Sequence, residues 1–261
     1  MGTDAFLRWI RALRCATVLG VALTAWAGGA GAESYLILPL IGDRITIVGQ
    51  QQQTGSRIDK NKITFVQIKE PGFDNAALVA VDKAIHAARP NATTSMLRSR
   101  DPKVYALRDS WLSTDAVDVK ELLALVTSLA DSPADAHLVL ITPYRSEPML
   151  KTDRDYLGSG MVSGLGFYVD AVTPMHNDAG ENGIGFLGVF ANFQIAVIDL
   201  TSKAVEARER VVVGTAFPAA EAQDRNPWNA LSAARKESEL IGLMSREIES
   251  TLPRMLAAPK P

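Results

Sequence analysis

The chain has 261 residues with 27 basic and 29 acidic side chains, and 47% of its residues are hydrophobic. This balance, without a basic cluster, argues against a nucleic-acid-binding surface. One cysteine excludes an internal disulfide and a zinc site built from several cysteines. A chain of this length buries enough surface to fold unaided, so we predict no metal and no cofactor.

Residues 1–32 have the pattern of a cleavable secretory signal peptide. Three arginines in the first fourteen positions precede an apolar stretch at 15–26, and a small-residue tract ends in the pair Ala30 and Ala32. The apolar stretch is shorter than the roughly 20 residues that a membrane helix needs. We therefore expect cleavage after Ala32 and a periplasmic or secreted bacterial protein.

The expected mature chain is cysteine-free, because Cys15 lies in the segment that is removed. Such a chain suits an oxidising envelope, where it has no thiol to mispair. We expect a single α/β domain over 33–256 and a disordered tail over 257–261. The most apolar later segment, 185–200, is too short and too polar to span a membrane, so no span is expected after cleavage.

The first half of the mature chain alternates predicted strands and helices. In chain order, the expected elements are strands at 34–41 and 44–48 joined as a hairpin, a strand at 63–68, a helix at 73–89 capped by Asp74 or Asn75, short strands or loops at 93–98 and 104–107, a helix at 114–130 and a buried strand at 137–142.

The second half reads mainly as antiparallel strands followed by a helix. The expected elements are a charged loop at 145–157, strands at 165–172, 186–200 and 205–213, a polar loop at 173–185, and a last helix that Asn226 caps, Pro227 begins and Pro253 ends. The whole order predicts an α/β fold, in which a mixed sheet with a βαβ core is extended by an antiparallel meander and helices pack on the sheet.

The strand predicted at 186–200 carries a strict two-residue alternation. Its odd positions from Leu187 to Val197 are all apolar, whereas its even positions include Asn192 and Gln194. Because alternate side chains of a strand face opposite ways, we expect a half-buried strand. Asn192 and Gln194 would then face solvent or a cleft, and they are candidate binding residues.

Two serines in the glycine-rich stretch 158–166 are candidate nucleophiles. That stretch has glycine spacing loosely like a phosphate-binding loop, but it precedes a strand and therefore lacks the helix N-terminus such a loop needs. Ser159 and Ser163 can act as nucleophiles only where a base lies beside them, and His176 is the candidate base. This combination is the basis of an alternative function, a periplasmic serine hydrolase.

The polar loop after the strand at 165–172 is the other candidate site, because loops on a rigid sheet often carry function. It holds Asn177, Asp178 and Glu181 beside His176. These oxygen-bearing side chains suit ligand binding or a calcium ion, although their spacing matches no known calcium loop. A solvated hairpin loop is the alternative.

Two short segments resemble known families. The sequence Leu-Ile-Gly-Asp-Arg at 40–44 resembles the Gly-Asp-Ser block of lipases and esterases, but Arg44 stands where the nucleophilic serine would be, so we interpret the segment as a turn. The segment 195–207 resembles the hairpin of periplasmic assembly factors, such as curli-secretion and penicillin-binding-protein-activator lipoproteins. That resemblance implies an α/β domain that binds proteins.

We therefore expect an exported α/β protein that binds another envelope protein or a small periplasmic ligand and does not act as an enzyme. The absence of a converging Ser/His/Asp set, a metal-ligand spacing or a phosphate loop favours binding over catalysis. The serine hydrolase remains the alternative.

Overall fold

The computed structural model describes residues 33–50, 61–114, 119–127, 136–152, 155–176 and 180–258. The predicted signal peptide at 1–32, together with Asn177 and Asp178, lies outside the described residues. Across the described chain no helix is both long enough and apolar enough to cross a membrane. Ala257 of the predicted tail belongs to a helix, and residues 259–261 lie outside the described residues.

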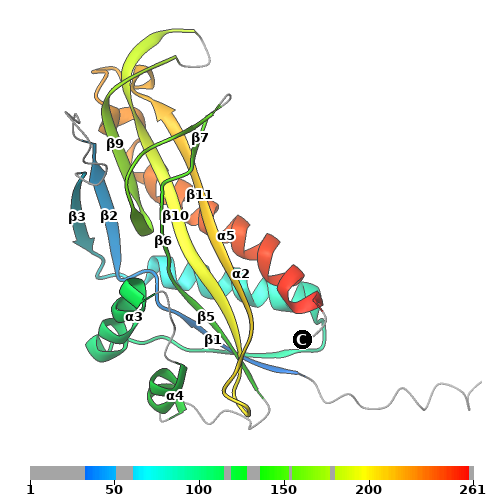
Figure 1. The fold of residues 1–261 in the computed structure, drawn as a ribbon. Helices are drawn as coiled ribbons and strands as arrows, with labels where there is room; N and C mark the ends of the chain where they lie inside the picture. The colour runs from blue at the N-terminus through cyan, green and yellow to red at the C-terminus, as the bar shows by residue number, and fades with distance from the viewer. Residues whose placement is uncertain are drawn as a thin grey trace, which may run out of the picture. The chain divides into compact units, whose positions relative to one another are not determined.

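The described residues form the predicted α/β fold, with helices packed on an open mixed sheet (Figure 1). The strands are β1 (Ser34–Pro39), β2 (Arg44–Gly49), β3 (Lys62–Gln67), β4 (Thr93–Met96), β5 (His137–Pro143), β6 (Arg145–Ser146), β7 (Leu150–Lys151), β8 (Tyr156–Leu157), β9 (Val162–His176), β10 (Asn182–Asp199) and β11 (Val205–Pro218). The helices are α2 (Gly72–Ala88), α3 (Pro102–Thr114), α4 (Val119–Thr127) and α5 (Ala233–Ala257), with 3₁₀ turns η1 (Ala219–Glu221) and η2 (Pro227–Ala230).

The long strand β10 organises the sheet. One of its edges pairs with β11 along nearly its whole length, while its other edge pairs first with β9 and then with β5. The sheet therefore forks. One branch continues from β9 to β2 and β3, and the other continues from β5 to β1 and β4. The strands β9, β10 and β11 are the predicted antiparallel meander, and the parallel strands β1, β4 and β5 are the βαβ part.

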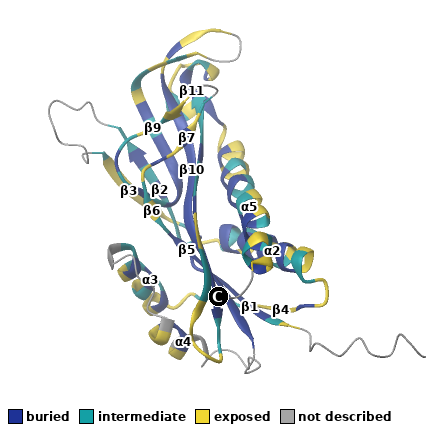
Figure 2. Ribbon diagram, turned by 45° about the vertical axis from the view of Figure 1, so that its right-hand side comes forward, coloured by how far each residue is buried: buried dark blue, intermediate teal, exposed yellow. Residues whose placement is uncertain are grey.

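The main core lies between the sheet and the helices α2 and α5 (Figure 2). The odd residues of β10 from Leu187 to Val197 all belong to this core, as their alternation predicts. The even residues Phe190, Ala196 and Ile198 are buried as well, within two smaller clusters on the opposite face. The strand β10 is thus buried on both faces, and the expected solvent-facing side is wrong.

The predicted N-terminal hairpin is also wrong. The strand β1 pairs in parallel with β4 and β5, whereas β2 pairs with β3 and β9. The chain crosses from one branch of the fork to the other at the turn Gly42–Asp43. This arrangement follows from the five consecutive buried residues at the end of β1, because a strand with both faces covered belongs inside a parallel sheet.

The helix bounds differ most where loops were expected. Residues 104–107 belong to α3, and the helix predicted at 114–130 overlaps the last residue of α3 and the whole of α4, while residues 115–118 and 128–130 lie outside the described residues. Asn226 does accept a hydrogen bond from the N–H of Trp228, but it caps the short turn η2. The last helix, α5, begins at Ala233 with Ser232 as its cap, and Pro253 lies inside it rather than at its end.

Candidate functional site: a basic cleft beside an exposed edge strand

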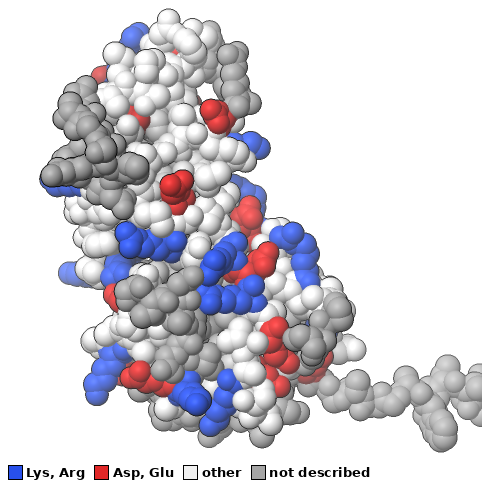
Figure 3. Space-filling view, viewed as in Figure 1, with Lys and Arg blue, Asp and Glu red and all other residues white. Residues whose placement is uncertain are grey.

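A cleft of about 980 Å³ opens where the two branches of the sheet meet α2 and α3. Its walls are the turn at 42–44, the segment 67–71 after β3, and the residues 98–109 that lead into α3. In Figure 3 basic side chains gather on this face, between the lower ends of β2 and β3 and the helix α3. The cleft is thus the place where three segments far apart in the sequence come together.

The turn at the floor of the cleft is held by a helix side chain. Oδ1 of Asp74 accepts hydrogen bonds from the backbone N–H groups of Ile41 (3.2 Å) and Gly42 (2.8 Å). No side chain caps α2, so Asp74 is not the helix cap that the sequence predicts. Burial raises the pKa of Asp74, and the N–H groups of Gly42 and Ile41 oppose that rise only in part.

A buried arginine fixes the other wall of the cleft. The Arg108 side chain is fully buried, and its guanidinium donates to both carboxylate oxygens of Asp43 and to Oδ1 of Asp109. Asp109 in turn binds Arg44 through two hydrogen bonds of 2.9 and 2.8 Å. These four side chains form one chain of ion pairs that joins α3 to the β1–β2 turn. The ion pairs hold the helix and the turn together and so fix the shape of the cleft.

The charges that remain after this pairing are mostly positive. Lys69 and Arg100 have no partner in the described part of the chain, and Arg98 donates only to the amide oxygen of Asn75 (3.0 Å). Among the carboxylates of the cleft wall, Glu70 and the buried Asp74 have no ion-pair partner within the described residues, since Asp43 and Asp109 are paired. The cleft therefore offers three cations to a ligand against two carboxylates, and Asp74 already accepts hydrogen bonds from the turn at 41–42.

The polar groups inside the cleft are suited to binding. The hydroxyl of Tyr105 donates to the carbonyl of Ser99, and burial beside Asp74 and Asp43 raises its pKa to about 12. It is therefore a neutral hydrogen-bonding group at neutral pH. The chemistry that these residues support is the capture of a carboxylate or another anion by arginine and lysine side chains.

The strand β3 runs into the cleft and is exposed along its full length. All six of its residues are exposed, and three of them are large apolar residues: Ile63 (45%), Phe65 (51%) and Val66 (42%). It pairs with β2 on one edge and ends the sheet on the other. Edge strands of natural proteins are usually shortened, charged or covered. An exposed apolar edge of this kind marks an interaction surface.

The structure does not bring the hydrolase candidates together. Ser163 is the second residue of β9 and His176 is the last, so they lie thirteen positions apart along the strand, a distance of roughly 40 Å. Ser159 precedes β9, where its hydroxyl lies 3.2 Å from the hydroxyl of Tyr168. In the described chain neither serine makes a hydrogen bond to a histidine.

Most of the residues expected in the polar loop at 173–185 belong to the strands β9 and β10. His176 pairs with Asn182 across the β9–β10 hairpin, so the expected loop at 173–185 is largely replaced by the ends of these strands. Glu181 and His176 are both exposed at that end. Asn177 and Asp178 lie outside the described residues.

Asn192 and Gln194 are buried, and neither lines the cleft. Nε2 of Gln194 donates to the Thr142 hydroxyl (2.9 Å), and its Oε1 accepts from Nε of Arg208 (2.8 Å). Oδ1 of Asn192 has no hydrogen-bond partner. Gln194 is therefore part of an internal polar network rather than a ligand-binding residue.

The sequence interpretation missed the cleft because its residues come from three separate segments. Of the residues that line the cleft, Asp74 is predicted as a helix cap, and the segment 40–44 resembles a hydrolase block. In the structure its Gly42, Asp43 and Arg44 line the cleft. The signal for β3 was present in its apolar residues, but sequence alone does not show that the strand lies at an edge.

Comparison with known proteins adds two distant structural neighbours. No family model and no curated protein matches the chain. Protein XCC0632 from Xanthomonas campestris, of the family DUF330, aligns over 86% of this chain and 83% of its own with 8% identity and a TM-score of 0.34. The hypothetical protein CT253 from Chlamydia trachomatis aligns over 88% and 100% with 8% identity and a TM-score of 0.31. Scores this low carry no argument about function.

Proposed function

We propose that the protein is an exported bacterial binding protein that captures an extended, carboxylate-bearing segment of another envelope protein. The observation that carries this proposal is the edge strand β3, with six exposed residues and no strand on its outer edge within the described sheet. The partner adds a strand to β3, and its acidic residues enter the adjoining cleft.

Strand addition accounts for the open outer edge of β3 and for its exposed apolar side chains. The outer edge offers a row of backbone N–H and C=O groups, which an extended peptide satisfies by pairing with them. The apolar side chains of Ile63, Phe65 and Val66 then pack against alternate side chains of the added strand. Backbone pairing gives affinity, and the side chains give selectivity.

The cleft accounts for the choice of an acidic partner. The segment 67–71 continues directly from β3 and forms one wall of the cleft, so a peptide paired with β3 reaches it without changing direction. Lys69, Arg98 and Arg100 face the cleft without a carboxylate partner. Carboxylates of the partner supply the missing counter-charges.

Export is part of the proposal. Its support is the signal pattern of residues 1–32, whose small-residue tract ends in the pair Ala30 and Ala32. N-terminal sequencing of protein recovered from the periplasm tests this. A mature chain that begins at Glu33 is expected, whereas an exported form that retains Met1 would contradict cleavage.

The binding proposal is tested with a synthetic peptide of about twelve residues, long enough to cover β3 and reach the cleft. One half alternates Val and Thr, the other half alternates Glu and Ser, and both orders of the halves are synthesised. Fluorescence anisotropy should show saturable binding that weakens as NaCl is raised, because salt screens the attraction to the exposed cations. A peptide with Lys in place of Glu should not bind.

Two substitutions separate the roles of edge and cleft. Phe65→Lys should weaken binding of the acidic peptide although it adds a positive charge, because the added strand loses an apolar contact on β3, and Arg100→Glu should weaken it about tenfold or more. The matched control is Val79→Lys, because Val79 is 64% exposed on α2, away from β3 and the cleft. Equal binding by the Glu and Lys peptides, or equal loss in the Val79 variant, would overturn the proposal.

A further inference from the structure

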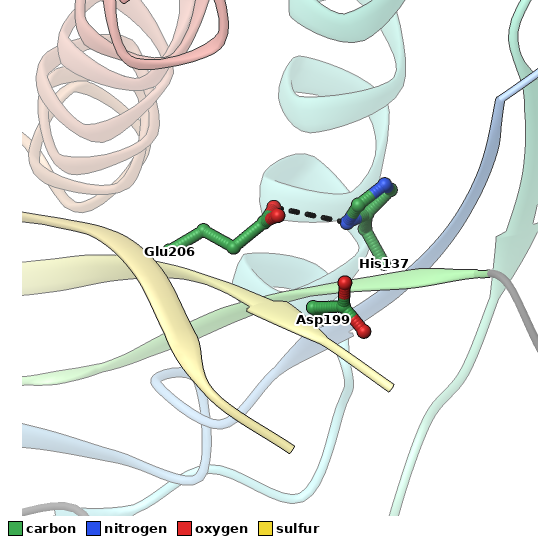
Figure 4. A group of neighbouring side chains, drawn as sticks. All are labelled: His137, Asp199 and Glu206. Atoms are coloured by element: carbon green, nitrogen blue, oxygen red, sulfur yellow. Dashed lines mark ion pairs between the residues drawn. The ribbon is translucent and has the colours of Figure 1, made fainter. Parts of the chain in front are cut away.

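A second cluster of polar side chains lies outside the cleft, where three strands end side by side. It contains His137, the first residue of β5; Asp199, the last residue of β10; and Glu206, near the start of β11 (Figure 4). One ligand atom from each residue lies within 4.8 Å of the other two. The three come from parts of the chain up to 69 positions apart, which explains why no sequence motif reveals them.

The sheet register places two of these residues opposite one another. Asp199 and His137 are direct cross-strand partners, so their side chains leave the same face of the sheet. Glu206 joins them through a β-bulge. Val197 pairs with Ala207 and Ile198 with Val205, which leaves Glu206 as the extra residue between them. A bulge of this kind redirects a side chain, and here it turns Glu206 towards His137.

One ring nitrogen of the histidine in this cluster has no hydrogen-bond partner. His137 is only 8% exposed, and its Nδ1 is buried without a hydrogen-bond partner. This nitrogen points into the cluster, 3.1 Å from Oε2 of Glu206, but that contact does not have the direction of a hydrogen bond. A buried nitrogen left in this state is costly unless another group satisfies it.

We infer that His137, Asp199 and Glu206 form a binding site for a divalent transition-metal cation such as Zn²⁺. One imidazole nitrogen and two carboxylate oxygens are ligands that zinc accepts, at distances of about 2.0–2.2 Å. Ligand atoms of a tetrahedral zinc site lie about 3.4 Å apart. The Nδ1–Oε2 separation of 3.1 Å is already close to that value, and a carboxylate oxygen of Asp199 lies within 4.8 Å of both atoms.

Access and positioning also suit an ion. Asp199 and Glu206 are half-buried, so a cation reaches the site from solvent. Oδ1 of Asp199 accepts the backbone N–H groups of Thr201 (2.7 Å) and Ser202 (2.9 Å), which hold its carboxylate in place. Three protein ligands leave a fourth position for water or a small anion. This inference is independent of the peptide-binding cleft.

Isothermal titration calorimetry of the purified protein with ZnCl₂ tests the site. One Zn²⁺ per chain is expected. Asp199→Asn keeps an acceptor for the turn, and Glu206→Gln keeps the shape of the side chain, so both variants should fold but bind Zn²⁺ at least about tenfold more weakly. Glu209→Gln, an exposed carboxylate on the same strand, is the matched control and should bind as the wild type does.

A second measurement guards against loss of folding in the variants. Thermal melts without metal should agree for all four proteins, and added Zn²⁺ should raise the midpoint only for the wild type and Glu209→Gln. Absence of saturable binding, or binding that Glu206→Gln leaves unchanged, would overturn the site. His137 and Glu206 would then be an ion pair alone.

Discussion

Asp74 on α2 holds the β1–β2 turn by accepting a 2.8 Å hydrogen bond from the backbone N–H of Gly42. The approach is so close that a Cβ at residue 42 would lie 2.7 Å from the backbone nitrogen of Asp74 and 2.9 Å from its carboxyl carbon. The floor of the cleft therefore depends on glycine at this position.

Gly42→Ala should destabilise the protein by about 1–3 kcal/mol, because the added methyl group pushes the turn away from α2. Urea denaturation measures this. The control is Gly72→Ala at the first residue of the same helix, where a Cβ meets nothing within 4 Å. That variant should be neutral or slightly stabilised. If Gly42→Ala were as stable as Gly72→Ala, the close contact between turn and helix would be refuted.

Asp74→Asn should change how stability depends on pH. Because burial raises the folded-state pKa of Asp74 above its ordinary 3.8, the folded chain holds this proton more tightly than the unfolded chain does. The wild type therefore loses stability as the pH rises from 3.8 through the raised folded-state pKa of Asp74. Above that pKa the loss stays constant. Asparagine carries no charge and escapes this loss.

Urea melts of wild type and Asp74→Asn over a pH series provide the measurement. The variant should gain stability relative to wild type as the pH rises from about 4 and should keep that gain at neutral pH. A relative stability that is independent of pH, or that moves in the opposite direction, would show that the pKa of Asp74 is not raised.

Arg108→Lys should be strongly destabilising although it keeps the positive charge. Lysine cannot reproduce the paired hydrogen bonds that the guanidinium gives to Asp43 while it also binds Asp109. We expect a loss of about 3 kcal/mol, at the low end for a broken buried ion pair because Asp109 is partly exposed. Arg98→Lys in the same cleft, which involves one amide contact, should cost little. Similar melting curves for the two variants would be evidence against the network.

The two amides of β10 should respond differently to leucine. Asn192→Leu removes an acceptor that lacks a hydrogen bond and one long hydrogen bond of 3.5 Å from Nδ2 to the carbonyl of Glu147, so its effect on the unfolding free energy should stay within about 1 kcal/mol. Gln194→Leu removes the partners of Thr142 and Arg208 and should cost about 1–3 kcal/mol. Thermal or urea melts compare them. The reverse order would mean that Asn192 has an essential polar partner.

The sequence predicted the elements and buried faces that depend on local periodicity. The helix at 72–88 was expected within one residue because Leu78, Val81 and Ile85 recur at helical spacing, and the odd residues of β10 face the helices as their alternation predicted. The same alternation predicted that Asn192 faces solvent or a cleft, whereas Asn192 is buried. A two-residue period indicates which residues share a face, but it does not tell whether a second layer covers the other face.

Long-range contacts were out of reach for sequence analysis. Asp74 has the position and chemistry of a helix cap, yet its carboxylate is used by the turn at Gly42, 32 residues away. Glu206 reads as a solvent-facing residue of an alternating strand, and only the bulge opposite Val197 and Ile198 redirects it. The cleft and the metal cluster both depend on such pairings between distant segments.

Strand addition to β3 is detected directly by hydrogen–deuterium exchange with and without the acidic peptide. If the peptide adds a strand to β3, every second backbone amide between Lys62 and Gln67 gains a partner on the open edge, and its exchange should slow. Amides on the inner edge, already paired with β2, should change little. Unchanged exchange throughout β3 at saturating peptide, or new protection confined to another edge of the sheet, would contradict the account.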